Sequence, residues 1–219
     1  MIKIENVDVF GWESAIRGMR NPMNSWDKSD SCFEVGVEED FGLMYRTNHI
    51  GENDLKLMKS LSKAGSDHGK FLRMINVTLD ITAPLYWWKE FDTYKVGTVA
   101  NSCSTMHKIQ AKEFTEDDFS HDKLIEYGEE KSFRHCLSFV IEYLNFARTK
   151  YLETKNKDYW WQMIQLLPSS YNQKRTVQLN YQVLKTMYHA RKLHKLDEWR
   201  EFCAWCETLP YFKEICLDE

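Results

Sequence analysis

The chain has 219 residues, of which 43 % are hydrophobic and only four are proline, which argues against disorder and allows one sizeable core over residues 1–219. Its formal net charge of −4, with both signs mixed, excludes the basic field that holds nucleic acid without sequence preference. No run approaches the ~18 apolar residues of a membrane span, and the start, MIKIENVDVF, lacks the features of a signal peptide. We therefore expect a single cytoplasmic domain with reduced cysteines that binds neither nucleic acid nor a membrane.

The start of the chain is predicted to alternate short regular elements with turns. Its apolar pattern predicts a strand over residues 2–9 and a helix over residues 13–19. Residues 21–40 contain several turn formers, which are Pro22, Ser25, Asp27, Ser29 and Asp30. We expect this third segment to be irregular.

The next elements carry clearer signals. Asn53 and Asp54 are candidates for the cap of a helix that ends near Gly65. From Ile75 to Ile81 apolar and polar residues alternate, which predicts a strand with one buried face. Pro84 is expected in the first turn of the helix that follows.

The second half of the chain is predicted to be mostly helical. Apolar residues recur at helical spacing over residues 133–144, and a shorter helix is expected over residues 159–166. Two more helices are expected over residues 177–191 and 196–208, the last of them halted by Pro210. Helices outnumber strands and do not alternate regularly with them, which favours an α+β fold.

Residues 81–108, ITAPLYWWKEFDTYKVGTVANSCSTMHK, are the most informative segment. They are predicted to hold a strand end, an aromatic-rich helix and a loop dense in small polar residues. Thr93, Tyr94 and Lys95 are followed, after seven residues, by Cys103. This spacing resembles the hallmark of the flavin-dependent thymidylate synthases, in which R-H-R is followed, after seven residues, by Ser.

Weaker matches to the same family continue in order along most of the chain. Residues 15–26, AIRGMRNPMNSW, resemble its early helix and turn, and residues 61–84 resemble the helix, loop and strand that lead into the signature. The Leu-Pro pair at residues 167–168 is followed by Asn180 and, eleven residues later, by Arg191, as in the family. The shared order is more specific for fold than for activity.

Several positions depart from the family pattern. Glu90 stands where the family has Gln, Thr105 and Ile164 stand where it has Arg, and Gln182 replaces the last residue of an Asn-x-Arg triplet. Among the hallmark positions only Lys95 keeps a cation. Because each lost charge-assisted bond to a phosphate is worth roughly 1.5–3 kcal/mol, we expect ordinary dUMP to be a poor ligand.

The resemblance implies a fold and a chemistry. The fold would be α+β with a central antiparallel sheet and flanking helices, assembled as a homotetramer with flavin between subunits. The reaction would be reductive methylation of a pyrimidine nucleotide with FAD, methylenetetrahydrofolate and NADPH. By position, the implied residues are Arg191 for catalysis, Thr93, Tyr94, Lys95, Asn180, Gln182 and Thr186 for the cofactor, and Glu90, Asn101, Cys103 and Thr105 for the substrate.

Asn180 and Arg191 are expected to share one face of the helix predicted over residues 177–191, because eleven residues make three helical turns. An Arg on an apolar stripe needs a partner. Arg191 either faces the pyrimidine, as the resemblance implies, or pairs with an acidic neighbour or extends into solvent. Lys95 likewise either holds a pyrophosphate or ring edge or is a solvated surface residue.

Other candidate sites are weaker. Cys203 and Cys206 form a C-x-x-C on an apolar stripe, which favours buried core cysteines over a redox pair or zinc site. His194 and Glu198 have the spacing of a helix-surface pair, and no third ligand for a metal is found. The acidic run 116–118 is expected to form a solvated turn and cap.

Two classes of function follow. The retained Asn180, Arg191 and Lys95 support a divergent enzyme that handles flavin and a pyrimidine nucleotide. The lost arginines support a non-catalytic relative kept for binding or assembly. A third class, a thiol enzyme that uses Cys103, requires a nearby cation to lower the pKa of that thiol.

Overall fold

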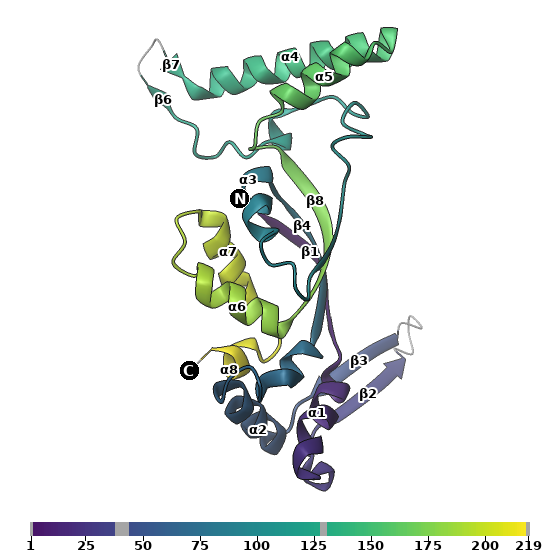
Figure 1. The fold of residues 1–219 in the computed structure, drawn as a ribbon, viewed down its shortest axis with the longest axis vertical. Coiled ribbons are helices and arrows are strands. Elements are labelled where there is room, and N and C mark those ends of the chain that lie inside the picture. The colour runs from purple at the N-terminus through teal and green to yellow at the C-terminus, as the bar shows by residue number, and fades with distance from the viewer. Residues whose placement is uncertain (1, 38–43, 128–130, 218–219) are drawn as a thin grey trace.

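The computed structural model describes residues 2–37, 44–127 and 131–217 (Figure 1). The strands are β1 (Lys3–Phe10), β2 (Cys32–Val37), β3 (Met44–His49), β4 (Asn76–Pro84), β5 (Val99–Ser102), β6 (Glu126–Tyr127), β7 (Lys131–Ser132) and β8 (Asn172–Asn180). The helices are α1 (Trp12–Arg20), α2 (Glu52–Lys63), α3 (Leu85–Phe91), α4 (Phe133–Thr154), α5 (Lys157–Leu166), α6 (Tyr181–Arg191), α7 (Asp197–Cys206) and α8 (Phe212–Cys216), and a short 3-10 helix, η3, spans Gly69–Arg73.

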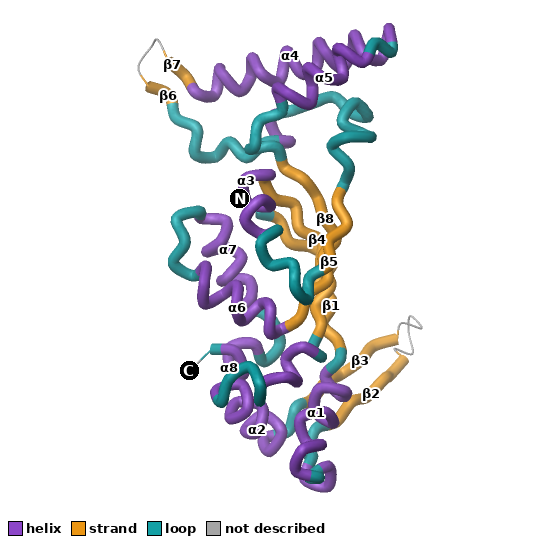
Figure 2. The backbone as a smooth tube through the Cα atoms, viewed as in Figure 1, coloured by secondary structure: helices purple, strands orange, loops and turns teal. Residues whose placement is uncertain are grey.

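An antiparallel sheet in the order β1-β4-β8-β5 forms the centre of the molecule (Figure 2). Val77, Leu79 and Ile81 of β4 are buried, while Thr78 and Asp80 between them are only half-buried. This alternation confirms the strand predicted there. The sheet with its flanking helices also confirms the expected α+β architecture.

Helices α3, α6 and α7 pack against the apolar face of the sheet (Figures 1 and 2). The interior between them is aromatic: Trp87, Trp88, Phe91, Trp199 and Phe202 are all buried. Their ring centroids lie 4.8–6.4 Å apart, mostly in edge-to-face or tilted pairs. Such pairs add to the stabilisation from buried apolar area. Many of the aromatic residues therefore serve the core, and this core positions α6 and the loop after α3.

The opposite face of the sheet is polar and centred on Asp80. Its carboxylate accepts hydrogen bonds from the Thr176 hydroxyl at 2.6 Å and the Asn6 amide at 2.8 Å, and it pairs with Lys174 at 3.0 Å. These bonds, led by that from Thr176, lower the pKa of Asp80 to about 2.

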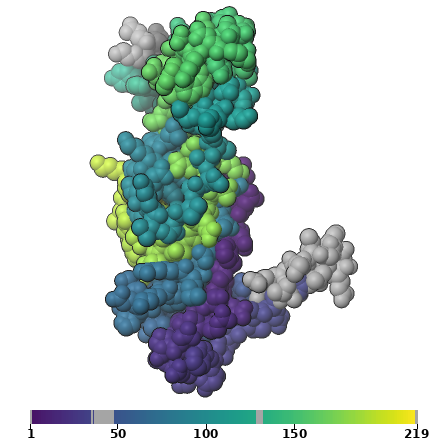
Figure 3. Space-filling model, turned by 45° about the vertical axis from the view of Figure 1, so that its right-hand side comes forward, coloured from purple at the N-terminus to yellow at the C-terminus, as the bar shows by residue number. Residues whose placement is uncertain are grey.

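Helices α4 and α5 form a lobe at one end of the molecule (Figures 1 and 3). Its own core consists of Ile109, Phe114, Phe119, Leu137, Leu144, Ala147 and Met163. On another side of α4, Phe139, Tyr143 and Phe146 are each more than half exposed at i, i+4 and i+7 spacing. These three residues form an aromatic stripe on the outside of the lobe.

Two predictions of secondary structure are wrong. Residues 21–40 are not wholly irregular, because residues 32–37 form β2 and pair with β3 in a hairpin; residues 38–40 lie outside the described residues. Residues 177–191 are not one helix. Residues 177–180 belong to β8, and each of them pairs with a residue of β4. Helix α6 begins at Tyr181.

The predicted cap of α2 is also wrong. The helix begins at Glu52, and both Asn53 and Asp54 lie inside its first turn. The carboxylate of Asp30 serves as the cap, accepting the N–H groups of Asn53 at 2.9 Å and Asp54 at 3.1 Å. Asp54 instead forms a buried ion pair with Arg20 at 2.6 Å.

The remaining helices and strands agree with expectation. The predictions for β1, α1, α4, α5 and α7 are confirmed within a few residues, apart from the longer C-terminal end of α4. Gly65, with φ +104°, follows the end of α2 as predicted. Pro84 is the N-cap of α3 rather than a residue of its first turn.

Candidate functional site

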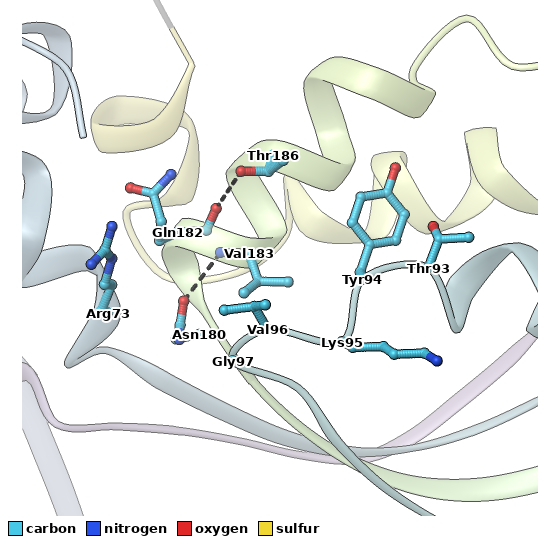
Figure 4. A pocket seen from close by; sticks show the side chains of 10 residues that line it. All are labelled: Arg73, Thr93, Tyr94, Lys95, Val96, Gly97, Asn180, Gln182, Val183 and Thr186. Atoms are coloured by element: carbon cyan, nitrogen blue, oxygen red, sulfur yellow. Dashed lines mark hydrogen bonds between the residues drawn. The ribbon is translucent and has the colours of Figure 1, made fainter.

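A pocket of ≈ 440 Å³ opens at the start of α6 (Figure 4). Three segments wall it: the end of η3, the loop that follows α3, and the junction of β8 with α6. The lining residues are Arg73, Thr93, Tyr94, Lys95, Val96, Gly97, Asn180, Gln182, Val183 and Thr186. We refer to this cavity as the α6 pocket.

Asn180 shapes the junction between β8 and α6. Its backbone is extended, and its side-chain Oδ1 accepts the Val183 N–H at 3.1 Å (Figure 4). This cap satisfies one of the backbone donors that a helix leaves unpaired at its start. One turn further on, Thr186 donates its hydroxyl to the Gln182 carbonyl at 3.0 Å. The first turns of α6 are thereby fixed against the pocket.

The loop after α3 is held close to α6. Gly97 has φ +80°, and a Cβ there would lie 3.1 Å from Val183 Cγ2 and 3.2 Å from Asn180 Nδ2. The start of the loop is fixed by Asp92, whose carboxylate accepts a hydrogen bond from Arg175 Nη1 at 2.7 Å. The pocket wall therefore depends on a close backbone approach at one end and an ion pair at the other.

Arg191, the last residue of α6, contacts Tyr94 but is not one of the residues that line the pocket. Its Nη1 donates to Glu90 Oε2 at 2.7 Å, and its Nε donates to Tyr94 Oη at 2.9 Å. Its guanidinium lies over the Trp199 ring, 4.9 Å from the centroid. Glu90 Oε2 also accepts the Trp199 indole N–H at 3.1 Å and lies 3.3 Å from His194 Nε2. We refer to these five residues as the Arg191 cluster.

The residues predicted to bind the cofactor come together in the α6 pocket. All of Thr93, Tyr94, Lys95, Asn180, Gln182 and Thr186 line it. They come from two segments that are some 85 positions apart in the sequence. Their contact with a cofactor stays a prediction, but their proximity is a property of the fold.

The residues predicted to bind the substrate do not share one place. Glu90 belongs to the Arg191 cluster. Asn101 lies on β5, opposite Thr176. Cys103 and Thr105 follow β5 along the sheet edge, where the Cys103 N–H donates to a β8 carbonyl at 2.9 Å. Their substrate contacts stay predictions.

Asn180 and Arg191 were expected on one face of a continuous helix, and that helix does not include Asn180, which ends β8 and is the N-cap of α6. Asn180 precedes α6 and Arg191 ends it. At about 1.5 Å rise per residue, eleven residues separate them by about 16 Å along the axis. Arg191 pairs with an acidic residue, Glu90, and its contact with a pyrimidine stays a prediction.

Two other predictions have opposite outcomes. His194 lies before α7 and contacts Glu90, while the buried Glu198 accepts the Tyr86 hydroxyl, so the predicted pair does not form. Cys203 and Cys206 are buried in the core, as predicted. Burial raises the pKa of Cys203 to about 11, which keeps it an unreactive thiol.

The sequence analysis missed part of the pocket lining. Arg73, Val96, Gly97 and Val183 were not identified as site residues. The signal for Gly97 was available, since a lone Gly in a polar loop indicates a backbone turn. Arg73 carries no such signal, because only the fold of η3 brings it to α6.

Residues 116–118 form a 3-10 turn with a capping box between Thr115 and Asp118, as expected, but only Glu116 and Asp117 are solvated, because Asp118 is buried. Within the described residues, no group of three or more His, Cys, Asp or Glu is placed to hold a metal ion. In that same part of the chain, none of the helices combines the length and apolar character needed to cross a membrane.

No family model and no curated protein matches the sequence. Solved structures do match the fold. A flavin-dependent thymidylate synthase (ThyX) from Helicobacter pylori, complexed with FAD and dUMP, matches with a TM-score of 0.67 and 14 % identity, covering 99 % of this chain and 98 % of that chain. A second structure of that enzyme with FAD and dUMP gives 0.68 and 15 %, covering 100 % of both chains.

A third match is a UMP/dUMP methylase, PolB, from Streptomyces cacaoi, bound with 5-Br dUMP. Its TM-score is 0.62 at 14 % identity, covering 98 % of this chain and 94 % of that chain. At such low identity the likeness establishes architecture and leaves activity open. The chain therefore has the fold of the flavin-dependent thymidylate synthases over its full length.

Proposed function

We propose that this protein is a flavin-dependent enzyme that binds FAD in the α6 pocket and acts on a pyrimidine nucleotide or a derivative of one, with ordinary dUMP a poor substrate. The observation that carries the proposal is the pocket itself. Residues singled out as cofactor ligands from sequence alone line one cavity in a fold shared with proteins crystallised with FAD.

The lining of the α6 pocket fits FAD chemically. In the described part of the chain, Arg73 and Lys95 have no ion-pair partner, so both are open to the negatively charged diphosphate. Gln182 and Thr186 offer hydrogen-bonding groups, and Val183 offers an apolar surface to a ring. A bound flavin would supply the electron transfer, and the protein would supply position and field.

Folate, NADPH and a homotetrameric assembly complete the proposal. The aromatic stripe of α4 supports the assembly, because Phe139, Tyr143 and Phe146 expose apolar area that subunit contacts typically cover. A tetramer would also enlarge the pocket with residues from neighbouring subunits. Analytical ultracentrifugation of the purified protein tests the assembly.

Flavin binding is tested by titrating the purified protein with FAD and with riboflavin, which lacks phosphate. The double substitution Arg73→Gln/Lys95→Gln should weaken FAD binding about tenfold or more, because two charge-assisted contacts are lost. Riboflavin binding should change little. The exposed Lys89, which lies on α3 outside the pocket lining, provides the control Lys89→Gln.

A protein that is colourless when purified and does not bind added FAD would contradict the proposal. That outcome would favour the second candidate, a non-catalytic binding or assembly protein. One observation already supports this alternative: the charge of Arg191 is neutralised by Glu90. Mass spectrometry of small molecules released on denaturation separates the two candidates without an assumed substrate.

A further inference from the structure

One side of α4 carries an uncovered row of residues with the repeat of a coiled coil. The three residues of the aromatic stripe, Phe139, Tyr143 and Phe146, are 61 %, 62 % and 57 % exposed. The stripe continues at both ends with the same alternating spacing of three and four residues. The full set, which we call the α4 seam, is Cys136, Phe139, Tyr143, Phe146, Lys150 and Glu153. Residues at this spacing stay on one side of a helix and are the positions through which two helices pack.

The α4 seam does not belong to the core of its own lobe. Leu137, Leu144 and Ala147 are buried on a different side of α4, where the helix packs with Met163 of α5. Three large aromatic rings exposed in one row form an apolar patch of the kind that association with another protein surface covers. Covering the seam therefore requires a surface from outside this lobe.

The charges along the α4 seam complement those of a reversed copy of the same seam. The first half is acidic, because Glu142 flanks the stripe and Glu116 accepts a hydrogen bond from the Ser138 hydroxyl at 3.4 Å. The second half holds Lys150, which forms an exposed ion pair with Glu153 at 2.9 Å. Among the described residues, Glu142 has no cation at ion-pair distance. Two parallel copies would place Glu142 beside Glu142, whereas two antiparallel copies bring the acidic half of each to the lysine of the other.

A hollow of ≈ 280 Å³ beside Phe139 fits that lysine. It is lined by His135, Ser138, Phe139 and Glu142. Full antiparallel overlap of two seams places Tyr143 opposite Phe146, Phe139 opposite Lys150, and Cys136 opposite Glu153. The Lys150 side chain of each copy then enters the hollow of the other, with its methylene groups on an aromatic ring and its ammonium group near a carboxylate.

We propose that α4 is a self-association surface, and that a second copy of this chain docks on it antiparallel through the α4 seam. The two-fold axis lies between residues 144 and 145, so that every contact across it is made twice. This contact would be one interface of the assembly included in the proposed function, and it is independent of FAD.

Disulfide cross-linking tests the register of the two helices. Cys136 and residue 153 are seventeen positions apart, about 25 Å along one helix, so a disulfide between them forms only between two chains. Glu153→Cys in a Cys32→Ser/Cys103→Ser background should give a covalent dimer on mild oxidation, with the bond located at Cys136 by peptide mass spectrometry. Gln165→Cys, at an exposed position of α5, should give none in the same background. Dimers linked through two Cys136 side chains would mean parallel helices and would overturn the proposal.

A charge exchange tests the contact between Lys150 and Glu142. The two residues are eight positions apart, about 12 Å along α4, so they do not pair within one chain. Glu142→Lys and Lys150→Glu should each raise the dissociation constant of the assembly about fivefold or more, because like charges then face each other. The double variant Glu142→Lys/Lys150→Glu should recover most of that loss. Glu113→Lys, at an exposed position outside the seam, is the control, and sedimentation over a concentration series measures all four.

The stripe itself is tested by Phe139→Glu, which should halve the mass of the assembly. Circular dichroism should show an unchanged fold, because Phe139 is exposed. An assembly that none of the three single variants in the seam weakens overturns the α4 contact and leaves the assembly in place. A wild-type chain that sediments as a monomer rejects both. Neither outcome concerns FAD, whose binding is decided by the separate flavin titration.

Discussion

The two ends of α6 present polar residues in different ways. At its start, the helix borders an open pocket whose cations, Arg73 and Lys95, have no ion-pair partner in the described part of the chain. At its end, Arg191 is enclosed by Glu90 and stacked on a buried indole, that of Trp199. Both ends of α6 have basic side chains. They differ because a carboxylate of the same chain pairs with Arg191, whereas none pairs with Arg73 or Lys95 among the described residues.

This comparison shows that the fold pairs one of these cations with a carboxylate and leaves the other two without one among the described residues. Arg175 is also paired, since Asp92 neutralises it beside the pocket wall. In a charge count of the sequence, all four of these cations are equivalent. In the folded chain, two are paired with carboxylates and two have no such partner among the described residues.

The largest expected effect comes from the end of α6, where Arg191 is paired with Glu90. Trp199→Ala removes the ring beneath Arg191 and leaves a cavity among buried aromatics, because Trp199 is 0 % exposed. We expect the free energy of unfolding to fall by about 3–5 kcal/mol. Denaturant unfolding followed by fluorescence or circular dichroism measures this change.

Trp161→Ala is the matched control for that substitution. Trp161 is 41 % exposed on α5, so its removal should cost far less stability. Gln182→Ala, at the open end of α6, should likewise stay within about 0.5 kcal/mol of wild type. Equal losses in the free energy of unfolding for Trp199→Ala and Gln182→Ala would mean that the two ends of α6 do not differ in their contribution to stability.

A smaller effect is expected at the open end, from Gly97→Ala. The left-handed backbone of Gly97 costs other residues about 1–2 kcal/mol, and its Cβ would press on Val183 and Asn180. Gly65→Ala has the same sign of φ, but its Cβ would meet no atom within 4 Å. The excess loss of Gly97→Ala over Gly65→Ala therefore measures the close approach alone.

FAD affinity makes this comparison sharper. Gly97→Ala should shift the loop that carries Thr93 and Lys95 and should weaken FAD binding, whereas Gly65→Ala should not. If both substitutions leave FAD affinity unchanged, the close approach at Gly97 has no part in shaping the site.

How much of this was predictable from the sequence depends on the range of the interactions. The strand at residues 75–81 and the helix at residues 159–166 were predicted because local periodicity encodes them. Residues 177–180 were placed in a helix because their apolar spacing continues that of α6. The pairing of β8 with β4 overrode this local preference, and no window of β8 alone contains the residues of β4.

The site divides in the same way. The resemblance pointed to six cofactor positions by their spacing in the sequence, and all six residues line the pocket. The pairing of Glu90 with Arg191 joins residues 101 positions apart, and Arg73 reaches the pocket from a separate 3-10 helix. Contacts of this kind depend on the packing of α3, α6 and η3, which sequence spacing does not contain.

The smallest expected effect concerns a third internal pair, on the polar face of the sheet. Hydrogen bonds from Thr176 and Asn6, together with Lys174, lower the pKa of Asp80 from 3.8 to about 2. A carboxyl group with a lowered folded-state pKa stabilises the fold above its unfolded pKa, and this contribution is lost as the pH falls through the folded value. The Asp80 contribution should therefore be complete above about pH 4 and absent below about pH 2.

Asp80→Asn tests this contribution through the free energy of unfolding measured between pH 7 and pH 2. The variant should be less stable than wild type near pH 7, and the gap should close toward pH 2, because a protonated Asp80 resembles the amide. Asp67→Asn, at an exposed turn position, is the control for loss of one carboxylate. A stability difference that stays constant with pH would mean that the Asp80 side chain acts through packing or geometry and not through its charge. Pairing of internal charges, as between Arg191 and Glu90, would then not explain the polar face of the sheet.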